Sequence, residues 1–136
     1  MMPESVPLWV MKADHDFKDG TDQLRTDEPA TDTICFHMQQ CAEKYLKAYL
    51  VSKSAKPART HDIQLLICLC ANLDESFNRL LDGGCDKLTL YAVDIRYPDD
   101  LAFPAIKEAE QAIALADEIR KFVMGKLCAA GYQARS

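Results

Sequence analysis

The sequence is poor in residues that break helices and in aromatic side chains. Only 5 of the 136 residues are glycine and 6 are proline, and 8% are aromatic, whereas alanine and leucine are abundant. Such a composition is typical of helical proteins. Long apolar runs are absent too, since the stretch 63–71 is far below the roughly 20 residues that a membrane-spanning helix needs. We therefore expect no membrane segment.

Paired cysteine motifs and an export signal are also lacking. The 6 cysteines occur at irregular spacing among apolar residues, with no CxxC pair of the kind that binds zinc. The first ten residues carry Glu4 but no lysine or arginine, which does not fit a secretory signal peptide. We expect free thiols in a reducing compartment, hence a cytoplasmic protein, with no metal site and no other cofactor.

What is present fits one ordinary globular domain, with 49% hydrophobic and 27% charged residues. The net charge of −5 resides in residues 1–33, because the remainder holds equal numbers of acids and bases. Within that remainder, residues 44–59 contain five cations and no acid. Such a local excess can attract phosphate. The alternative is a solvated helix end whose cations complement the helix dipole.

Hydrophobic residues recur with the 3.6-residue period of helices between clusters of helix-breaking residues. We predict helices over about 7–24, 32–52 and 104–126, a third helix that Thr60 caps and that extends to Leu73 or on to Leu81, and a short segment over about 86–95. No segment alternates as a strand does. The predicted fold class is therefore all-α, an up-and-down four-helix bundle with an additional short helix. One domain spans 1–136, with its core over about 7–126.

The predicted core follows one stripe on each helix. Its members are Leu8, Met11, Phe17 and Leu24; Ile34, Met38, Cys41, Tyr45 and Ala48, with Cys35, Ala42, Leu46 and Tyr49 beside them; Ile63, Leu66, Ile67 and Cys70; and Ile106, Ala109, Ile113, Ala116, Ile119 and Val123.

Polar residues of the second helix recur along one face. His37, Gln40, Lys44 and Lys47 are spaced three, four and three residues apart, which places them on the same side of a helix. Glu43 precedes Lys47 by four residues, the favourable orientation for a surface ion pair. Two interpretations are open. The stripe is either a solvated outer face or the lining of a groove between two subunits.

Three motifs in a fixed order resemble those of HEPN domains (higher eukaryotes and prokaryotes nucleotide-binding). They are FHxQQxAEKxLKAxL over 36–50, RTHDI over 59–63, and a tyrosine followed by RYPD over 91–99. The first helix matches more loosely, at Trp9, Ala13 and Asp16. The resemblance covers about residues 7–125. It implies a helical bundle that usually forms a homodimer and often pairs with a small nucleotidyltransferase in a two-component, toxin–antitoxin-type system.

Many HEPN members are ribonucleases that need no metal, and these carry an arginine separated by four to six residues from a histidine. No arginine of this chain is followed by a histidine at that spacing, so whether the protein is an enzyme is left open. His61 lies beside Asp62, and histidine is the usual proton shuttle near neutral pH. If His61 faced Arg96 across the bundle, the two would be candidate catalytic residues. The alternative is that His61 and Asp62 only order a helix start.

Binding is the preferred hypothesis. Pro98 favours an extended Tyr97 and so fixes the direction of Arg96, whose guanidinium suits phosphate while tyrosine rings suit a base. The alternative is that Arg96 pairs with a nearby carboxylate and braces the bundle. The predicted ligand- or phosphate-binding residues are Lys44, Lys47, Arg96, Tyr91, Tyr97, Gln40 and His37.

We therefore expect an accessory protein that binds a nucleotide or nucleic acid and pairs with a small nucleotidyltransferase. The alternatives are a divergent metal-independent ribonuclease toxin and a purely structural helical module that docks a partner.

Overall fold

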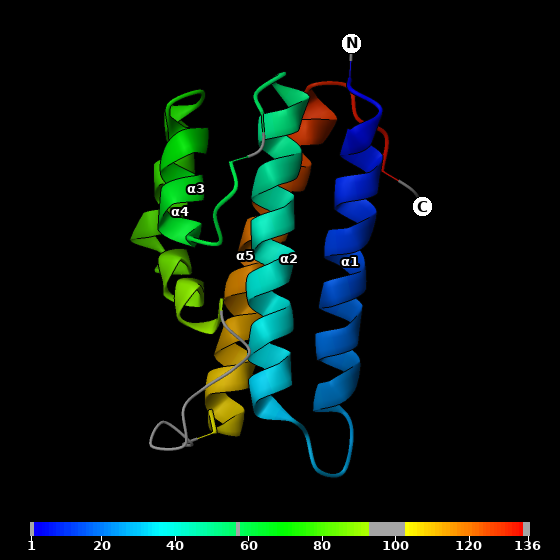
Figure 1. The fold of residues 1–136 in the computed structure, drawn as a ribbon, viewed down its shortest axis with the longest axis vertical. Coiled ribbons are helices and arrows are strands. Elements are labelled where there is room, and N and C mark those ends of the chain that lie inside the picture. The colour runs from blue at the N-terminus through cyan, green and yellow to red at the C-terminus, as the bar shows by residue number, and fades with distance from the viewer. Residues whose placement is uncertain (1, 57, 93–102, 135–136) are drawn as a thin grey trace.

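The molecule consists of three long helices and a layer of shorter ones (Figure 1). The structure is a computed structural model that describes residues 2–56, 58–92 and 103–134. The elements are α1 (Ser5–Leu24), α2 (Thr31–Ser52), α3 (Ile63–Ala71), the 3-10 helix η1 (Glu75–Phe77), α4 (Asn78–Asp82), the 3-10 helix η2 (Cys85–Tyr91) and α5 (Ile106–Ala129). No strand occurs in these ranges, so the all-α prediction is confirmed. None of their helices is both long and apolar enough to cross a membrane.

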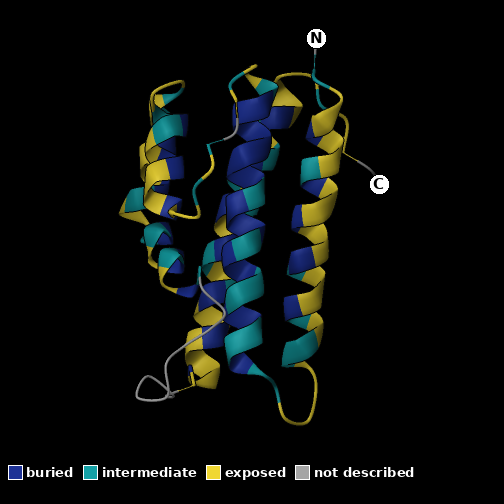
Figure 2. Ribbon diagram, viewed as in Figure 1, coloured by how far each residue is buried: buried dark blue, intermediate teal, exposed yellow. Residues whose placement is uncertain are grey.

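The second helix is the centre of the fold. In Figure 1, α2 lies between α1 on one side and the α3–α4 layer on the other, with α5 behind it. Most of its length is buried or half-buried, as the dark blue and teal of Figure 2 show. The predicted core residues of α2 and α3 are all buried, including Met38, Tyr45 and Leu66 at 1% exposure or less. Since α2 packs on several sides, even its polar positions have neighbours.

The buried face of α1 differs from the predicted stripe. Leu8 and Met11 are 53% and 38% exposed, so their assignment to the core is wrong. The buried residues of α1 are Val6, Val10, Ala13, Asp16 and Gly20. Gly20 permits a close approach, because a Cβ there would lie 2.3 Å from Cε of Met38 on α2. Phe17 and Leu24 are partly buried at the edge.

The last helix keeps most of its predicted stripe but begins later than expected. Ile106 is 45% exposed, so that core assignment is wrong, and Ile113 is only partly buried. Ala109, Ala116, Ile119 and Val123 are buried, as predicted. Pro104 precedes the helix instead of opening it, because Ala105 is the N-cap and has extended backbone angles.

The start and the end of α3 correct two further predictions. The N-cap is Asp62, whose side chain accepts a hydrogen bond from the Leu65 amide at 3.2 Å, as N-cap carboxylates do. Thr60 instead accepts from the Asp62 amide at 3.1 Å. The helix does not reach Leu81. Asp74 has an extended backbone and caps η1 by accepting from the Ser76 amide at 3.0 Å, which starts a new segment.

The remaining predictions on the fold concern boundaries and thiols. The short segment expected over 86–95 is η2, Cys85–Tyr91, and the rest of that range extends beyond the described residues. All 6 cysteines lie in the described ranges and none forms a disulfide.

Candidate functional site

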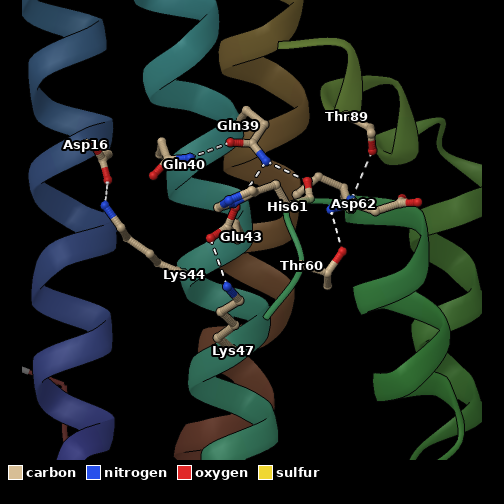
Figure 3. Close-up of polar contacts among 11 residues, drawn as sticks. Asp16, Gln39, Gln40, Glu43, Lys44, Lys47, Thr60, His61, Asp62 and Thr89 are labelled. Carbon is tan, nitrogen blue, oxygen red and sulfur yellow. Dashed lines mark hydrogen bonds and ion pairs between the residues drawn. The ribbon is translucent and has the colours of Figure 1, made fainter. Parts of the chain in front are cut away.

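The polar residues of α2 lie on a strip between α1 and the connection 53–62 that follows α2 (Figure 3). Residues 58–62 lie along the helix, so that His61 contacts Glu43 and Gln39, about two and a half and three and a half turns before the helix ends. Gln39, Glu43 and Lys47 are therefore 0%, 5% and 7% exposed. The interpretation of the predicted stripe as a solvated outer face is therefore wrong for Lys47, and the ion pair of Glu43 with Lys47 does not lie at the surface as expected.

Glu43 is the hub of a hydrogen-bond network. Its carboxylate accepts from Nζ of Lys47 at 2.9 Å, from Nδ1 of His61 at 2.8 Å and from Nε2 of Gln39 at 3.3 Å. Gln39 also donates to the backbone carbonyl of His61 at 2.8 Å, and Gln40 donates to Oε1 of Gln39 at 2.7 Å. The Glu43–Lys47 ion pair that the spacing predicted thus exists, but in a buried position.

The network fixes the charge of Glu43 and the tautomer of His61. Burial alone would raise the pKa of Glu43, but the hydrogen bonds from His61 and Lys47 together outweigh burial and hold the pKa below its ordinary value. An ionised carboxylate only accepts hydrogen bonds. Nδ1 of His61 must therefore carry the proton, and a neutral imidazole keeps its lone pair on Nε2. The His61 side chain is 70% exposed.

The other part of the predicted stripe turns toward α1. Nζ of Lys44 lies 2.5 Å from Oδ2 of Asp16, and Nδ1 of His37 lies 2.9 Å from Oδ1 of the same carboxylate. Figure 3 shows Lys44 reaching to α1 while Lys47 points toward Glu43. His37 and Lys44 therefore belong to a network centred on Asp16, whereas Gln40 and Lys47 belong to the network of Glu43. Their role in ligand binding stays a prediction.

The five cations of residues 44–59 fall into two groups. Lys44 and Lys47 are paired with carboxylates, whereas Lys53, Lys56 and Arg59 are exposed and make no ion pair within the described part of the chain. We call these last three residues the cationic connection. Nζ of Lys53 lies over the ring of Tyr49, 5.7 Å from its centre, and the residue remains exposed. Positive charge that is free to meet an anion thus lies after α2 and not on it.

The remaining predicted site residues lie elsewhere. Tyr91 is 9% exposed and its hydroxyl donates to Glu108 on α5, so its ring is largely covered. Arg96 and Tyr97 lie outside the described residues, and the predicted pocket between Arg96 and α2, like the pairing of His61 with Arg96, stays a prediction. In the described ranges, no three histidine, cysteine, aspartate or glutamate side chains form a cluster that could hold a metal.

A cavity of about 630 Å³ lies between α1 and α5, away from this strip. Tyr45 and Arg120 are among its lining residues, and both are already engaged. The Tyr45 hydroxyl donates to Asp14, and the guanidinium of Arg120 pairs with Asp117 at 2.7 Å and lies 4.5 Å from the ring centre of Phe17. None of the predicted site residues lines this cavity.

Two partners of the site were not predicted as such. Asp16 interrupts the buried face of α1, and a carboxylate among apolar positions is a sequence pattern that could have indicated a buried ion pair. Gln39 precedes Glu43 by four residues, the spacing of helix neighbours. The contact between Glu43 and His61 joins two residues that are 18 positions apart in the chain, and no local pattern indicates it.

These features define a helical bundle in which two sequence motifs, 36–50 and 59–63, meet at a carboxylate–imidazole contact. A family model of the HEPN domain matches residues 6–127, and the chain belongs to this family. Among solved structures, the crystal structure of TT1696 from Thermus thermophilus is similar, with 28% identity and a TM-score of 0.73 over 91% of this chain and 99% of that chain. No curated protein matches the chain. Family membership supports a helical module related to nucleotides or RNA.

Proposed function

We propose that this protein binds the phosphates of a nucleotide or nucleic acid at the cationic connection. The observation that carries the proposal is that Lys53, Lys56 and Arg59 are exposed and free of ion pairs in the described ranges, although the protein as a whole is acidic. Glu43 is buried and paired with Lys47, and the exposed carboxylate of residues 53–62 is that of Asp62, which caps α3. An anion that approaches the connection therefore meets a local excess of positive charge.

Salt dependence distinguishes phosphate binding from other contacts. Each phosphate that a lysine or arginine neutralises releases counterions, and the affinity for a single strand falls with a log–log slope of about −0.7 per contact. Three contacts predict a slope of about −2. Binding through apolar surface alone would show little such dependence.

The test measures fluorescence anisotropy of a labelled single-stranded RNA at several salt concentrations. The variant Lys53→Gln/Lys56→Gln/Arg59→Gln is expected to weaken binding at least about tenfold and to flatten the slope by about 2. The matched control replaces Lys12, Lys87 and Lys107 by glutamine, which removes the same charge from exposed positions on other elements. Equal losses in both variants would contradict a localised site, and no loss in either would refute it.

Two predicted contacts complete the proposal. Arg96 and Tyr97 lie outside the described residues, and Arg96→Ala is expected to weaken RNA binding as well. If Arg96→Ala and the triple variant both bind as the wild type does, a purely structural docking module becomes the better hypothesis.

We propose further that the protein acts as a homodimer and as the accessory partner of a small nucleotidyltransferase in a toxin–antitoxin-type system. The support is the family resemblance, which implies both kinds of assembly. Co-expression with a nucleotidyltransferase encoded in the neighbouring reading frame, followed by co-purification and light scattering, measures the pairing and the subunit number. A protein that elutes as a monomer without the nucleotidyltransferase would contradict both the homodimer and the pairing.

A further inference from the structure

The cavity of about 630 Å³ between α1 and α5 has no part in the proposed function. Its volume lies within the range of about 300–1,000 Å³ that small-molecule sites occupy. We infer that this cavity binds an apolar α-amino acid, whose ammonium group meets Asp14, whose carboxylate meets Arg120 and whose side chain lies against Met11 and Met124. The inference does not depend on phosphate binding at the cationic connection.

The cavity exists because α1 and α5 pack mainly on α2 and only slightly on each other. Figure 1 shows the C-terminal end of α5 and the N-terminal end of α1 at the same end of the bundle. Gly125 of α5 lines the cavity, and a Cβ at this position would meet nothing within 4 Å. Glycine weakens a helix interior, and here no close neighbour requires it. Position 125 therefore leaves the space between the two helices open.

Two opposite charges line the cavity without pairing with each other. The carboxylate of Asp14 accepts a hydrogen bond from the hydroxyl of Tyr45 and forms no ion pair within the described residues. The guanidinium of Arg120 donates to Oδ1 of Asp117 from Nε at 3.0 Å and from Nη2 at 2.7 Å. These bonds use two of the five N–H donors of a guanidinium, so the others are left for a ligand. The cavity thus offers an acceptor and a charged donor.

The charges favour a ligand that carries both signs. A simple anion would be attracted by Arg120 and Lys121 but repelled by Asp14, and a simple cation would meet the opposite balance. Burial lowers the pKa of Arg120, but its hydrogen bond to Asp117 and the charges of Asp117 and Asp14 outweigh burial and raise the pKa. The guanidinium therefore stays charged. A zwitterion pairs its carboxylate with this guanidinium, the geometry in which arginine binds carboxylates best, and its ammonium group with Asp14.

Apolar side chains line much of the remaining wall. Val10 and Met11 come from α1, and Met124 and Cys128 come from α5. Met11 is 38% exposed although it is apolar, and its place in the cavity wall accounts for a large side chain that does not belong to the core. Methionine is flexible and polarisable, so it adapts to the shape of a bound group. An apolar side chain of the ligand would displace water from this part of the wall.

The first test observes the cavity wall directly, by NMR of the full chain labelled with ¹³C at its methionine methyl groups. Adding L-phenylalanine should shift the signals of Met11 and Met124 and saturate. Met38 is 0% exposed and does not line the cavity, so its signal should stay in place. The absence of a saturable shift overturns the inference. Shifts of Met11 and Met124 on dilution of the free protein would show that a second copy covers the cavity, and these also overturn it.

Analogues of L-phenylalanine test each part of the ligand in the same titration. 3-Phenylpropionate lacks the ammonium group, 2-phenylethylamine lacks the carboxylate, and glycine lacks the apolar side chain. Each is expected to bind at least about tenfold more weakly than L-phenylalanine, because one charged hydrogen bond or the apolar contact is lost. Equal affinity for any of the three overturns the assignment of a zwitterion with an apolar side chain.

Two variants place the ligand in the cavity. Asp14→Asn keeps an acceptor for the Tyr45 hydroxyl but removes the charge, and it should weaken L-phenylalanine binding at least about tenfold. The matched control is Asp19→Asn, an exposed position of α1 outside the cavity lining, which should bind as the wild type does. Gly125→Leu should fill the cavity and abolish binding, with a urea midpoint no lower than that of the wild type, since leucine favours helices. Unchanged binding in Asp14→Asn or in Gly125→Leu overturns the inference and leaves the proposed function standing.

Discussion

A carboxylate, a lysine and a histidine come together on each of two sides of α2, in different surroundings. Toward α1, the carboxylate of Asp16 binds Lys44 and His37; toward the connection, that of Glu43 binds Lys47 and His61. Both carboxylates are buried, at 9% and 5% exposure. The difference is the imidazole, because the His37 side chain is 24% exposed and the His61 side chain 70%. The triad of Asp16, Lys44 and His37 connects α1 with α2. The triad of Glu43, Lys47 and His61 leaves the His61 ring exposed to solvent.

The largest effect should come from removing the carboxylates. Glu43→Ala leaves Lys47, whose side chain is 9% exposed, as an uncompensated buried charge, and we expect it to lower the free energy of unfolding by about 3–5 kcal/mol. Asp16→Ala should cost less, about 1–3 kcal/mol, because Lys44 is 23% exposed and can turn to water. Urea unfolding monitored by circular dichroism measures both. Equal losses of unfolding free energy would mean that Lys47 reaches water as easily as Lys44 once its carboxylate partner is removed.

For the histidines, the larger loss of stability should occur on the α1 side, the reverse of the order expected for the carboxylates. His37→Ala removes a hydrogen bond to Asp16 between two packed helices, and we expect a loss of about 1 kcal/mol. His61→Ala should cost under about 0.5 kcal/mol, since water can replace an exposed ring at Glu43. The same urea curves measure these changes. A larger stability loss for His61→Ala would assign His61 a bracing role as well.

How far the sequence predicts the fold depends on side-chain size. The period of α2 and α3 is carried by large residues such as Ile34 and Leu66, and there the predicted core is confirmed. On α1 the buried face includes Ala13 and Gly20, which contribute little to a hydrophobic pattern. The pattern therefore favoured Leu8, which is large and exposed. When a helix packs through small residues, the pattern of its large apolar side chains does not indicate its buried face.

For the site, local spacing was sufficient and distant contacts were not. The Glu43–Lys47 pair lies within one helical turn and was predicted. The partners of Lys44 and His61 lie 28 and 18 residues away in the chain, and their meeting depends on how α1 and the connection pack on α2. For this reason the sequence predicted Lys44 as a phosphate contact although Asp16 already binds it, and the predicted Glu43–Lys47 pair was expected at the surface although it is buried. The sequence does not distinguish a free cation from one whose carboxylate partner lies far away in the chain.

A smaller effect distinguishes the triads by pH. The pKa of Glu43 is lower in the folded protein than its ordinary value of 4.5, so its ionisation stabilises the fold above pH 4.5 and this contribution disappears as the pH falls through the folded pKa. We expect the wild type to lose more stability than Glu43→Gln between pH 5 and pH 3. Urea midpoints at several pH values measure the slopes. Parallel slopes would show that other carboxylates dominate acid unfolding.

The smallest expected change in stability comes from replacing a whole ion pair. Glu43→Met/Lys47→Met removes both buried charges and keeps similar volume, and such replacements are often neutral or stabilising. The unfolding midpoint should thus stay near that of the wild type, in contrast to Glu43→Ala. His61 would nevertheless lose the acceptor of its Nδ1 proton, so nitrogen NMR of its ring should no longer report a proton held on Nδ1. If the proton stayed on Nδ1 in the double variant, the carboxylate would serve packing alone, and the two sides of α2 would differ only in how much water reaches them.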